Sequence, residues 1–258
     1  MSGSPNLEWA ELIPLVRKDI WVQNQTECFC SLGENPCPGV TIKYFDLLII
    51  KMREFILLAL KAKTTPDFVL EQLPEAGRMD LVCRTIANTL YVSNEMRRDT
   101  VIHVSMNGPR DPPKLMSFYG ETMKGLGMDE RAIGEMIRNT LKKGTRLALG
   151  EEIEASPGIK ISKKAFETLL KEKSQTSQLI YLHKKGEDIR TFQFKENNTF
   201  VLGDYIGLPG KTEKLLDRLG AQKIKLGPTM LFASHCPIIV HNELDRRIKE
   251  QFEDKSAQ

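Results

Sequence analysis

The chain has 258 residues, enough for one large domain or two small ones, each with its own core. Its residues are 41% hydrophobic and 28% charged, which is typical of a globular protein and excludes wholesale disorder. The 37 basic and 34 acidic residues leave a net charge of only +3, which neither requires nor excludes a nucleic-acid partner. Local clusters of charge must therefore decide that question.

The cysteine content and the first residues indicate in which cellular compartment the protein is found. Five cysteines, with no basic and apolar leader ahead of them, favour a reducing cytoplasmic environment over a disulfide framework. Two apolar runs between residues 40 and 60 are separated by Lys51, Arg53 and Glu54, so no run approaches the roughly 20 apolar residues needed to cross a bilayer. We predict a cytoplasmic protein without a membrane segment.

The first 51 residues differ from the rest of the chain. They are polar, and Cys28, Cys30 and Cys37 lie close together without a fourth metal ligand at a suitable spacing. We therefore predict no metal site, and an N-terminal extension over residues 1–51 that is either loosely ordered or an over-extended start. The folded domain is predicted over residues 52–258.

The domain is predicted to begin with a strand from Met52, because the run EFILLAL is typical of a strand buried on both faces. A helix is predicted from about Gly77 to about Ser93. Apolar residues recur there every three or four positions, at Met79, Val82, Cys83, Ile86, Ala87, Leu90 and Tyr91. Residues 100–106 then predict a second strand.

The next segment, NGPRDPP, cannot continue that strand because its prolines donate no amide hydrogen bond. A helix is predicted from about Asp129, which is its N-cap candidate. Residues 156–158 predict a turn, and a further helix is expected after Ser162.

The second half of the domain alternates strands and helices. The sequence predicts a strand at 179–182, a turn at Gly186, an edge or connecting piece at 191–195, a strand at 199–203, a helix at 212–219, a strand at 223–227 and a final helix just after Cys236. This alternation predicts an α/β fold, an open and largely parallel sheet with helices on both faces.

Three of these strands run into turns at residues 182–186, 203–204 and 226–228. Because the carboxyl ends of parallel strands meet at one edge of a sheet, the turns predict a pocket lined by main-chain amides and suited to an adenosine-bearing cofactor. The chain has no Ser/His/Asp order, paired metal-ligand motif, GxGxxG or Walker motif, which argues against a hydrolase, a metalloenzyme or a P-loop protein.

The last helix is predicted to begin at Cys236, ahead of Pro237, and its free amides favour a negatively charged or accepting ligand group. A buried thiol without any ligand contact is the alternative. Asn242 and Arg246, in the segment HNELDRR, lie off the apolar stripe of this helix, on a solvated face or on a polar partner surface.

The first half of the domain holds one notable cationic group, Arg78, Arg84, Arg97 and Arg98. Arginine suits RNA phosphates because its guanidinium is a permanently charged, bidentate fork. The alternative is that these arginines lie on a helix surface and pair with Asp80 or Asp99.

Taken together, the motifs resemble one family throughout residues 52–247. They are MREFIL, GRMDLVCR, RRD, NGPRDPP, SPGI, YLHKKGEDIR, VLGDYIGL, LGAQKIKLGP and HCPIIVHNELDRR, in that order. On these motifs the chain resembles the archaeal tRNA pseudouridine-54 N1-methyltransferases of the SPOUT superfamily, which use S-adenosylmethionine. Residues 1–51 have no counterpart in the family pattern.

The resemblance implies a C-terminal trefoil knot, a homodimer, tRNA as substrate and S-adenosylmethionine as cofactor. The cofactor contacts that it implies are Leu182, Gly203, Leu226, Gly227, Pro228, Thr229, Met230, Leu231 and Cys236. In the same resemblance, Arg78 and Asp80 are the candidates for orienting the base and assisting loss of its proton. Candidates for RNA binding are Arg84, Arg97, Arg98, Asn242 and Arg246.

Two other functions stay open. The ribosomal-RNA pseudouridine N1-methyltransferases share the chemistry but carry insertions in the α/β domain, and none is evident here. A SPOUT-like RNA-binding protein that has lost catalysis is the second, and the intact Gly203, Gly227 and Cys236 argue against it.

Overall fold

The computed structural model describes residues 52–93, 95–125 and 127–256, and in residues 250–256 the backbone only. The predicted N-terminal extension, with its three neighbouring cysteines, lies outside the described residues. Its boundary at Met52 stays a prediction.

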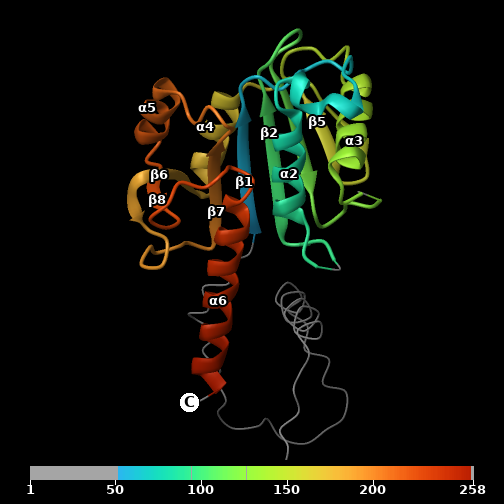
Figure 1. Ribbon diagram of the computed structural model, residues 1–258. Helices are drawn as coiled ribbons and strands as arrows, with labels where there is room; N and C mark the ends of the chain where they lie inside the picture. The colour runs from blue at the N-terminus through green and yellow to red at the C-terminus, as the bar shows by residue number, and fades with distance from the viewer. Residues whose placement is uncertain (1–51, 94, 126, 257–258) are drawn as a thin grey trace, which may run out of the picture. The chain divides into compact units, whose positions relative to one another are not determined.

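The described residues build one sheet of eight strands in the order β4-β5-β3-β2-β1-β7-β6-β8 (Figure 1). The strands are β1 (Met52–Ala59), β2 (Thr100–Met106), β3 (Lys114–Tyr119), β4 (Glu152–Ser156), β5 (Ile159–Ser162), β6 (Gln178–Asp188), β7 (Asn197–Gly203) and β8 (Gln222–Lys225). The five strands from β2 to β8 in this order pair in parallel, while β3, β5 and β4 extend the sheet by antiparallel pairing.

The helices are α2 (Met79–Leu90), α3 (Glu130–Lys143), α4 (Phe166–Thr176), α5 (Gly210–Arg218) and α6 (Cys236–Ser256), with a short 3₁₀ segment, η2 (Leu70–Ala76). Alternate residues of β1 point to opposite faces of the sheet. Phe55 and Leu57 share a core with residues of α2, α3 and α6, and Ile56 shares one with residues of α4 and α5. Helices therefore cover both faces, as predicted; in Figure 1, α2 lies in front of the sheet and α4 behind it.

Most of the predicted elements are confirmed within a few residues. The N-cap of α3 is Asp129, whose carboxylate accepts a hydrogen bond from the amide of Ala132 at 2.9 Å. The α6 helix begins at Cys236, as predicted. The short antiparallel strands β3, β4 and β5 were missed, although the predicted turn at 156–158 is the one that joins β4 to β5.

The predicted turn at Gly186 is wrong, because β6 continues through this residue to Asp188. Ile224 of β8 pairs with Leu182 and again with Glu187, and the register of β6 shifts between these two partners. A Cβ atom at Gly186 would lie 2.4 Å from the carbonyl carbon of Ile224. Glycine is therefore required here by the close approach of β8, and not by a turn.

A buried arginine joins the first strand to the last helix. Arg53, 2% exposed, forms ion pairs with Asp99 at 3.1 Å and with Asp245 of α6 at 2.6 Å. Asp245 also pairs with Arg97 at 2.7 Å. Arg53 donates to Nδ1 of His241 at 3.2 Å, and Nε2 of His241 donates to the carbonyl of Thr89 at 3.0 Å. Burial, together with the charges of Arg97 and Arg53, lowers the pKa of His241 and keeps its ring neutral.

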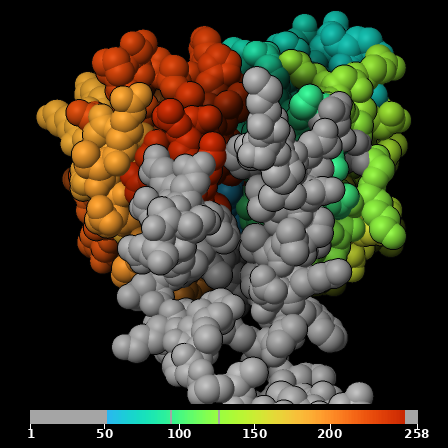
Figure 2. Space-filling model, turned by 90° about the horizontal axis from the view of Figure 1, so that it is seen from below, coloured from blue at the N-terminus to red at the C-terminus, as the bar shows by residue number. Residues whose placement is uncertain are grey.

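Arg247 of α6 fastens this helix to the connection between β6 and β7. Arg247 donates to the carbonyls of Phe192, Ile189 and Arg190 at 2.6, 2.7 and 2.9 Å. Its guanidinium carbon lies 4.7 Å from the ring centroid of Phe194. Figure 2 shows the orange surface of this connection next to the red surface of the last helix.

The carboxylate of Glu54, on the other face of β1, makes the stability of the fold depend on pH. Glu54 bonds to Nε2 of His103 at 3.0 Å, accepts from Thr199 at 2.8 Å and pairs with Lys173. Burial alone would raise the pKa of Glu54, but the bonds and charges of His103 and Lys173 outweigh it and lower the pKa from 4.5 to about 2. The stability contributed by the ionised Glu54 is therefore present above its ordinary pKa and is lost as the pH falls toward 2.

We expect Glu54→Gln to lower the free energy of unfolding at pH 7 by roughly 3 kcal/mol. This value corresponds to the lowering of the Glu54 pKa from 4.5 to about 2 on folding. At pH 2 to 3 the variant and the parent protein should differ much less. Urea unfolding across this pH range measures both values, and an equal loss at both ends would contradict the assignment to Glu54.

Candidate active site at the carboxyl edge of the sheet

The predicted convergence of three strands is confirmed in the sheet order. The strands β7, β6 and β8 are parallel neighbours, so their carboxyl ends lie at one edge. Two loops leave this edge: residues 204–209 after β7, and residues 226–235 between β8 and α6. At Leu182 the strand β6 does not end but shifts its pairing to β8.

The loop after β7 is folded back tightly. A Cβ atom at Gly203 would lie 2.4 Å from the carbonyl carbon of Gly207, so only glycine fits at this position. The carboxylate of Asp204 accepts hydrogen bonds from the amides of Leu60 and Ile206, both at 2.8 Å. These contacts attach the loop to the end of β1.

The loop after β8 presents free amides. The amides of Gly227, Thr229, Met230 and Leu231 donate no hydrogen bond to any residue that the structure describes, and residues 228–231 are exposed. A Cβ atom at Gly227 would meet no described atom within 4 Å. Main-chain donors beside open space suit the polar groups of a nucleotide-type ligand.

Cys236 closes this loop as the first residue of α6. Its side chain is buried, and its thiol donates to the carbonyl of Phe232 at 3.3 Å. Burial raises the pKa of Cys236 to about 11, so the side chain is a neutral thiol at ordinary pH. A ligand contact at this position would therefore be made by the main chain.

The amino end of α2 supplies the charged groups. Arg78 has a left-handed backbone, with φ of 64°, although it is not a glycine. Its Nε and Nη2 atoms donate to the two carboxylate oxygens of Asp80, both at 3.0 Å. Arg84 donates to Asp80 at 2.5 Å and pairs with Glu130 at 2.8 Å.

Asp80 itself is 3% exposed. Burial alone would raise its pKa, but the hydrogen bonds and charge of Arg78 and the charge of Arg84 outweigh burial and lower it. Asp80 is therefore a carboxylate that binds protons poorly and orients a bidentate arginine.

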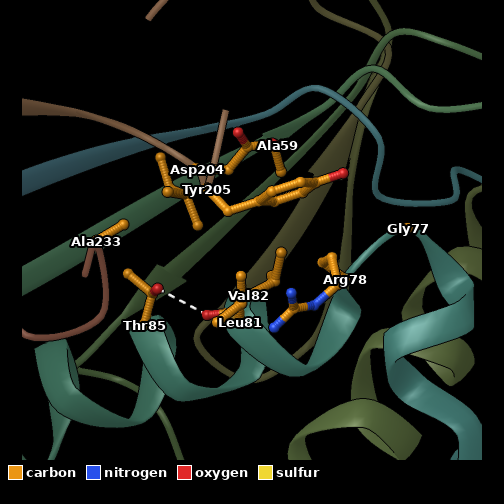
Figure 3. Close-up of a pocket in the computed structure, with 10 residues that line it drawn as sticks. Ala59, Gly77, Arg78, Leu81, Val82, Thr85, Asp204, Tyr205 and Ala233 are labelled. Atoms are coloured by element: carbon orange, nitrogen blue, oxygen red, sulfur yellow. Dashed lines mark hydrogen bonds between the residues drawn. The ribbon is translucent and has the colours of Figure 1, made fainter. Parts of the chain in front are cut away.

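A small pocket joins α2 to the two loops. Its lining consists of Leu57, Ala59, Gly77, Arg78, Leu81, Val82, Thr85, Asp204, Tyr205 and Ala233. Figure 3 shows the ring of Tyr205 opposite the face of α2 that carries Arg78, with Ala233 to one side. The guanidinium carbon of Arg78 lies 5.5 Å from the centroid of this ring. Arg78 and the loop after β7 thus form one site.

The other predicted cationic residues are placed differently. Arg97 lies against α6, where Asp245 holds it, and Arg98 donates to the carbonyls of Gly120 and Met123 at 2.9 and 3.1 Å. Asn242 and Arg246 are exposed on α6. Of the predicted RNA contacts, only Arg84 is therefore brought directly to Asp80.

Sequence reasoning placed Asp204 in a turn predicted to line the pocket, but missed Tyr205 and Ala233 as parts of the site. A signal was present for Tyr205, because it follows Gly203 and Asp204 in the segment VLGDYIGL at a predicted strand end. Among the described residues, no group of three or more His, Cys, Asp or Glu side chains could hold a metal ion. In the same part of the chain, no helix is long and apolar enough to cross a membrane.

An open, largely parallel sheet whose carboxyl edge carries loop amides without described partners, with a fixed arginine close to that edge, is typical of an enzyme that uses a nucleotide-type cofactor. Residues 52–248 match the family described as "Putative SAM-dependent RNA methyltransferase", and the chain belongs to this family.

Two relatives show the degree of similarity. The chain is 42% identical over 201 residues to the tRNA (pseudouridine(54)-N(1))-methyltransferase of Methanococcoides burtonii, a match that covers 76% of this chain and 98% of that protein. It is 37% identical over 201 residues to the protein of the same name from Methanocaldococcus jannaschii, with the same coverage of both chains. The predicted family is therefore confirmed.

One solved structure shares the fold. The crystal structure of Archaeoglobus fulgidus Nep1 bound to S-adenosylhomocysteine superposes with a TM-score of 0.51 at 15% identity and covers 76% of this chain and 98% of that one. The predicted fold class, an open and largely parallel α/β sheet with the knotted C-terminal part of SPOUT-like proteins, is confirmed.

We expect Gly227→Ala to weaken the binding of S-adenosylmethionine by about tenfold or more, since the added methyl group would enter the space beside the free amides. Its thermal midpoint should not change, because no described atom lies near the new Cβ. Gly210→Ala, at the start of α5, also meets nothing within 4 Å and is the matched control. Calorimetric titration measures the affinities, and equal affinities for both variants would exclude Gly227 from the cofactor site.

Proposed function

We propose that the chain transfers the methyl group of S-adenosylmethionine to N1 of the pseudouridine at position 54, in the T-loop of tRNA. The observation that carries this proposal is the 42% identity to a named tRNA (pseudouridine(54)-N(1))-methyltransferase along 98% of its length. Arg78, fixed by Asp80 in the pocket that also contains Tyr205 and Ala233, supplies a chemical reason for it.

The residues at the carboxyl edge of the sheet fit the cofactor. We propose that Leu182, Gly203, the loop residues Leu226 to Leu231 and the main chain at Cys236 hold S-adenosylmethionine, since this loop carries amide donors free of described partners. When bound, the cofactor supplies a methyl group on a cationic sulfur, which is already a strong electrophile. The protein therefore has to position the base and stabilise the charge that develops on it.

Arg78 is proposed to stabilise the charge that develops on the base. Loss of the N1 proton leaves negative charge on the uracil ring, and a guanidinium held in advance stabilises such charge without reorganising. Asp80 was predicted to orient the base and to assist the proton. Because both of its carboxylate oxygens accept hydrogen bonds from Arg78 at 3.0 Å, we assign Asp80 the positioning of Arg78, and the N1 proton leaves to a base in the surrounding solvent.

Contact with tRNA is proposed for the predicted cationic and polar residues. Arg84, Asn242 and Arg246 are exposed and suit phosphate contacts. Arg97 is held by Asp245 of α6, so we propose that it acts mainly by fixing that helix. Arg98 donates to two main-chain carbonyls but is itself exposed, so its predicted phosphate contact is kept. The cytoplasm, the predicted compartment, is where a tRNA substrate would be met.

A homodimer is proposed from the resemblance and from apolar side chains at the start of α6. Phe232, Ile238 and Ile239 are 67%, 48% and 37% exposed, which is unusual for residues so close in sequence. Light scattering should give a mass of about twice the chain's 29.3 kDa. A monomeric mass that Ile238→Glu leaves unchanged would contradict the dimer.

The proposed reaction is tested by incubating the protein with S-adenosylmethionine and tRNA bearing pseudouridine at position 54, followed by nucleoside mass spectrometry. We expect one methyl group on N1 of pseudouridine, and none on the same tRNA with uridine at that position. Methyl transfer to N3 of uridine or to ribose, or none at all, would overturn the reaction. Preferential transfer to a ribosomal-RNA hairpin would favour the first alternative function, and binding of RNA without transfer the second.

A further inference from the structure

Tyr205 is an exposed aromatic residue on a fixed loop at the proposed active site. The Tyr205 side chain is 51% exposed, yet the residues before and after it, Asp204 and Ile206, are both held by hydrogen bonds. The amide of Asp204 donates to the carbonyl of Leu58 at 3.1 Å, and the amide of Ile206 donates to the Asp204 carboxylate at 2.8 Å. The loop therefore holds the ring in place without burying it.

The ring lies beside the charged group proposed to act on the base. The guanidinium carbon of Arg78 is 5.5 Å from the ring centroid, within cation–π range but farther than the roughly 4 Å of flush stacking. Arg78 is in turn fixed by its two bonds to Asp80. Tyr205 thus keeps accessible ring surface next to a guanidinium that has a defined position (Figure 3).

A base in a folded RNA loop has to be splayed out before an enzyme can methylate its ring nitrogen. Proteins hold splayed bases by stacking them on aromatic rings or guanidinium planes and by hydrogen bonding at their edges. We propose that the target base stacks on the ring of Tyr205, where Arg78 reaches its edge. This assignment rests on the proposed function and adds to it the residue, Tyr205, on which the target base stacks.

Stacking is favoured over a purely apolar contact for two reasons. The exposed ring is paired with a cation, whereas the exposed residues Phe232, Ile238 and Ile239 have no such pairing in any described contact. In addition, Tyr205 lines the same pocket as Arg78 and Ala233, which belongs to the loop proposed to bind the cofactor. The ring thus lines one pocket with the charged residue and with the loop proposed to bind the cofactor.

The test compares Tyr205→Phe with Tyr205→Leu, since both keep an apolar side chain but only phenylalanine keeps a stacking surface. The probe is a single-stranded RNA of the T-loop sequence without its stem, with the fluorescent pyrimidine pyrrolo-cytosine at position 54. This base is largely unstacked and emissive in the free RNA, and its emission is quenched when it stacks on the protein. The parent protein and the Phe variant should quench it with affinities within about twofold of each other. The Leu variant should bind this RNA about 5- to 150-fold more weakly, as expected for one lost base stack, and should not quench it.

Binding of S-adenosylmethionine, the thermal midpoint and the oligomeric mass are measured on the same variants and should not change. The proposal is overturned if the Leu variant quenches like the parent protein. It is equally overturned if the Leu variant loses cofactor binding or changes its mass, because the ring would then serve the loop or a subunit interface. The quenching needs no methyl transfer, so failure of the proposed reaction and failure of the stacking are separate results.

Discussion

A single buried arginine links the first strand of the sheet to the last helix, and the position of the active site depends on this link. Arg53 lies at the start of β1 and pairs with Asp99 and with Asp245 of α6. Removing one partner from a fully buried charge pair typically costs about 3 to 5 kcal/mol, because the other charge is left uncompensated. The side chains of Asp99 and Asp245 are 41% and 43% exposed, which reduces the cost here, but the guanidinium of Arg53 is buried and needs both of them. The cluster therefore strongly favours one position for α6. The loop after β8 ends at Cys236, the first residue of that helix, and so its place is fixed as well.

A buried charge that is held by oppositely charged partners also fixes the amino end of α2. Asp80 is almost fully buried, but two arginines keep it ionised, and it fixes Arg78 through both carboxylate oxygens. A permanently charged group in a fixed position is well suited to stabilise charge on a base, and poorly suited to accept a proton. Catalysis by this chain is therefore best explained by positioning and electrostatics, with the electrophile supplied by the cofactor.

Local patterns predicted the elements that have strong periodicity or strong boundaries. The spacing of apolar residues indicated α2, and the N-cap residue Asp129 marked the start of α3. Gly186 was misassigned because a glycine in a polar segment is usually a turn, whereas here the close approach of Ile224, 38 positions along the chain, requires it. The short strands β3, β4 and β5 pair with one another and with β2, and that pairing leaves little trace in their own sequences.

The site was predictable in part. The strand ends and the pair Arg78 and Asp80 follow from motifs that are contiguous in sequence, and the structure brings Arg78 to the loop after β7. The partner of Arg97 lies 148 positions away, so its burial against α6 could not be seen in the sequence. Tyr205 follows a predicted strand end, but its place beside the guanidinium of Arg78 could not be seen in the sequence.

A double-mutant cycle on Arg78 and Asp80 tests the central claim, that Asp80 acts through Arg78, most directly. Single-turnover methyl transfer to tRNA would be measured for Arg78→Ala, Asp80→Asn and the double variant. We expect each single change to slow the reaction by about 10- to 1,000-fold and the double variant to be no slower than Arg78→Ala. If the two losses multiplied in the double variant, Asp80 would have a role of its own, such as accepting the proton, and the claim would be contradicted.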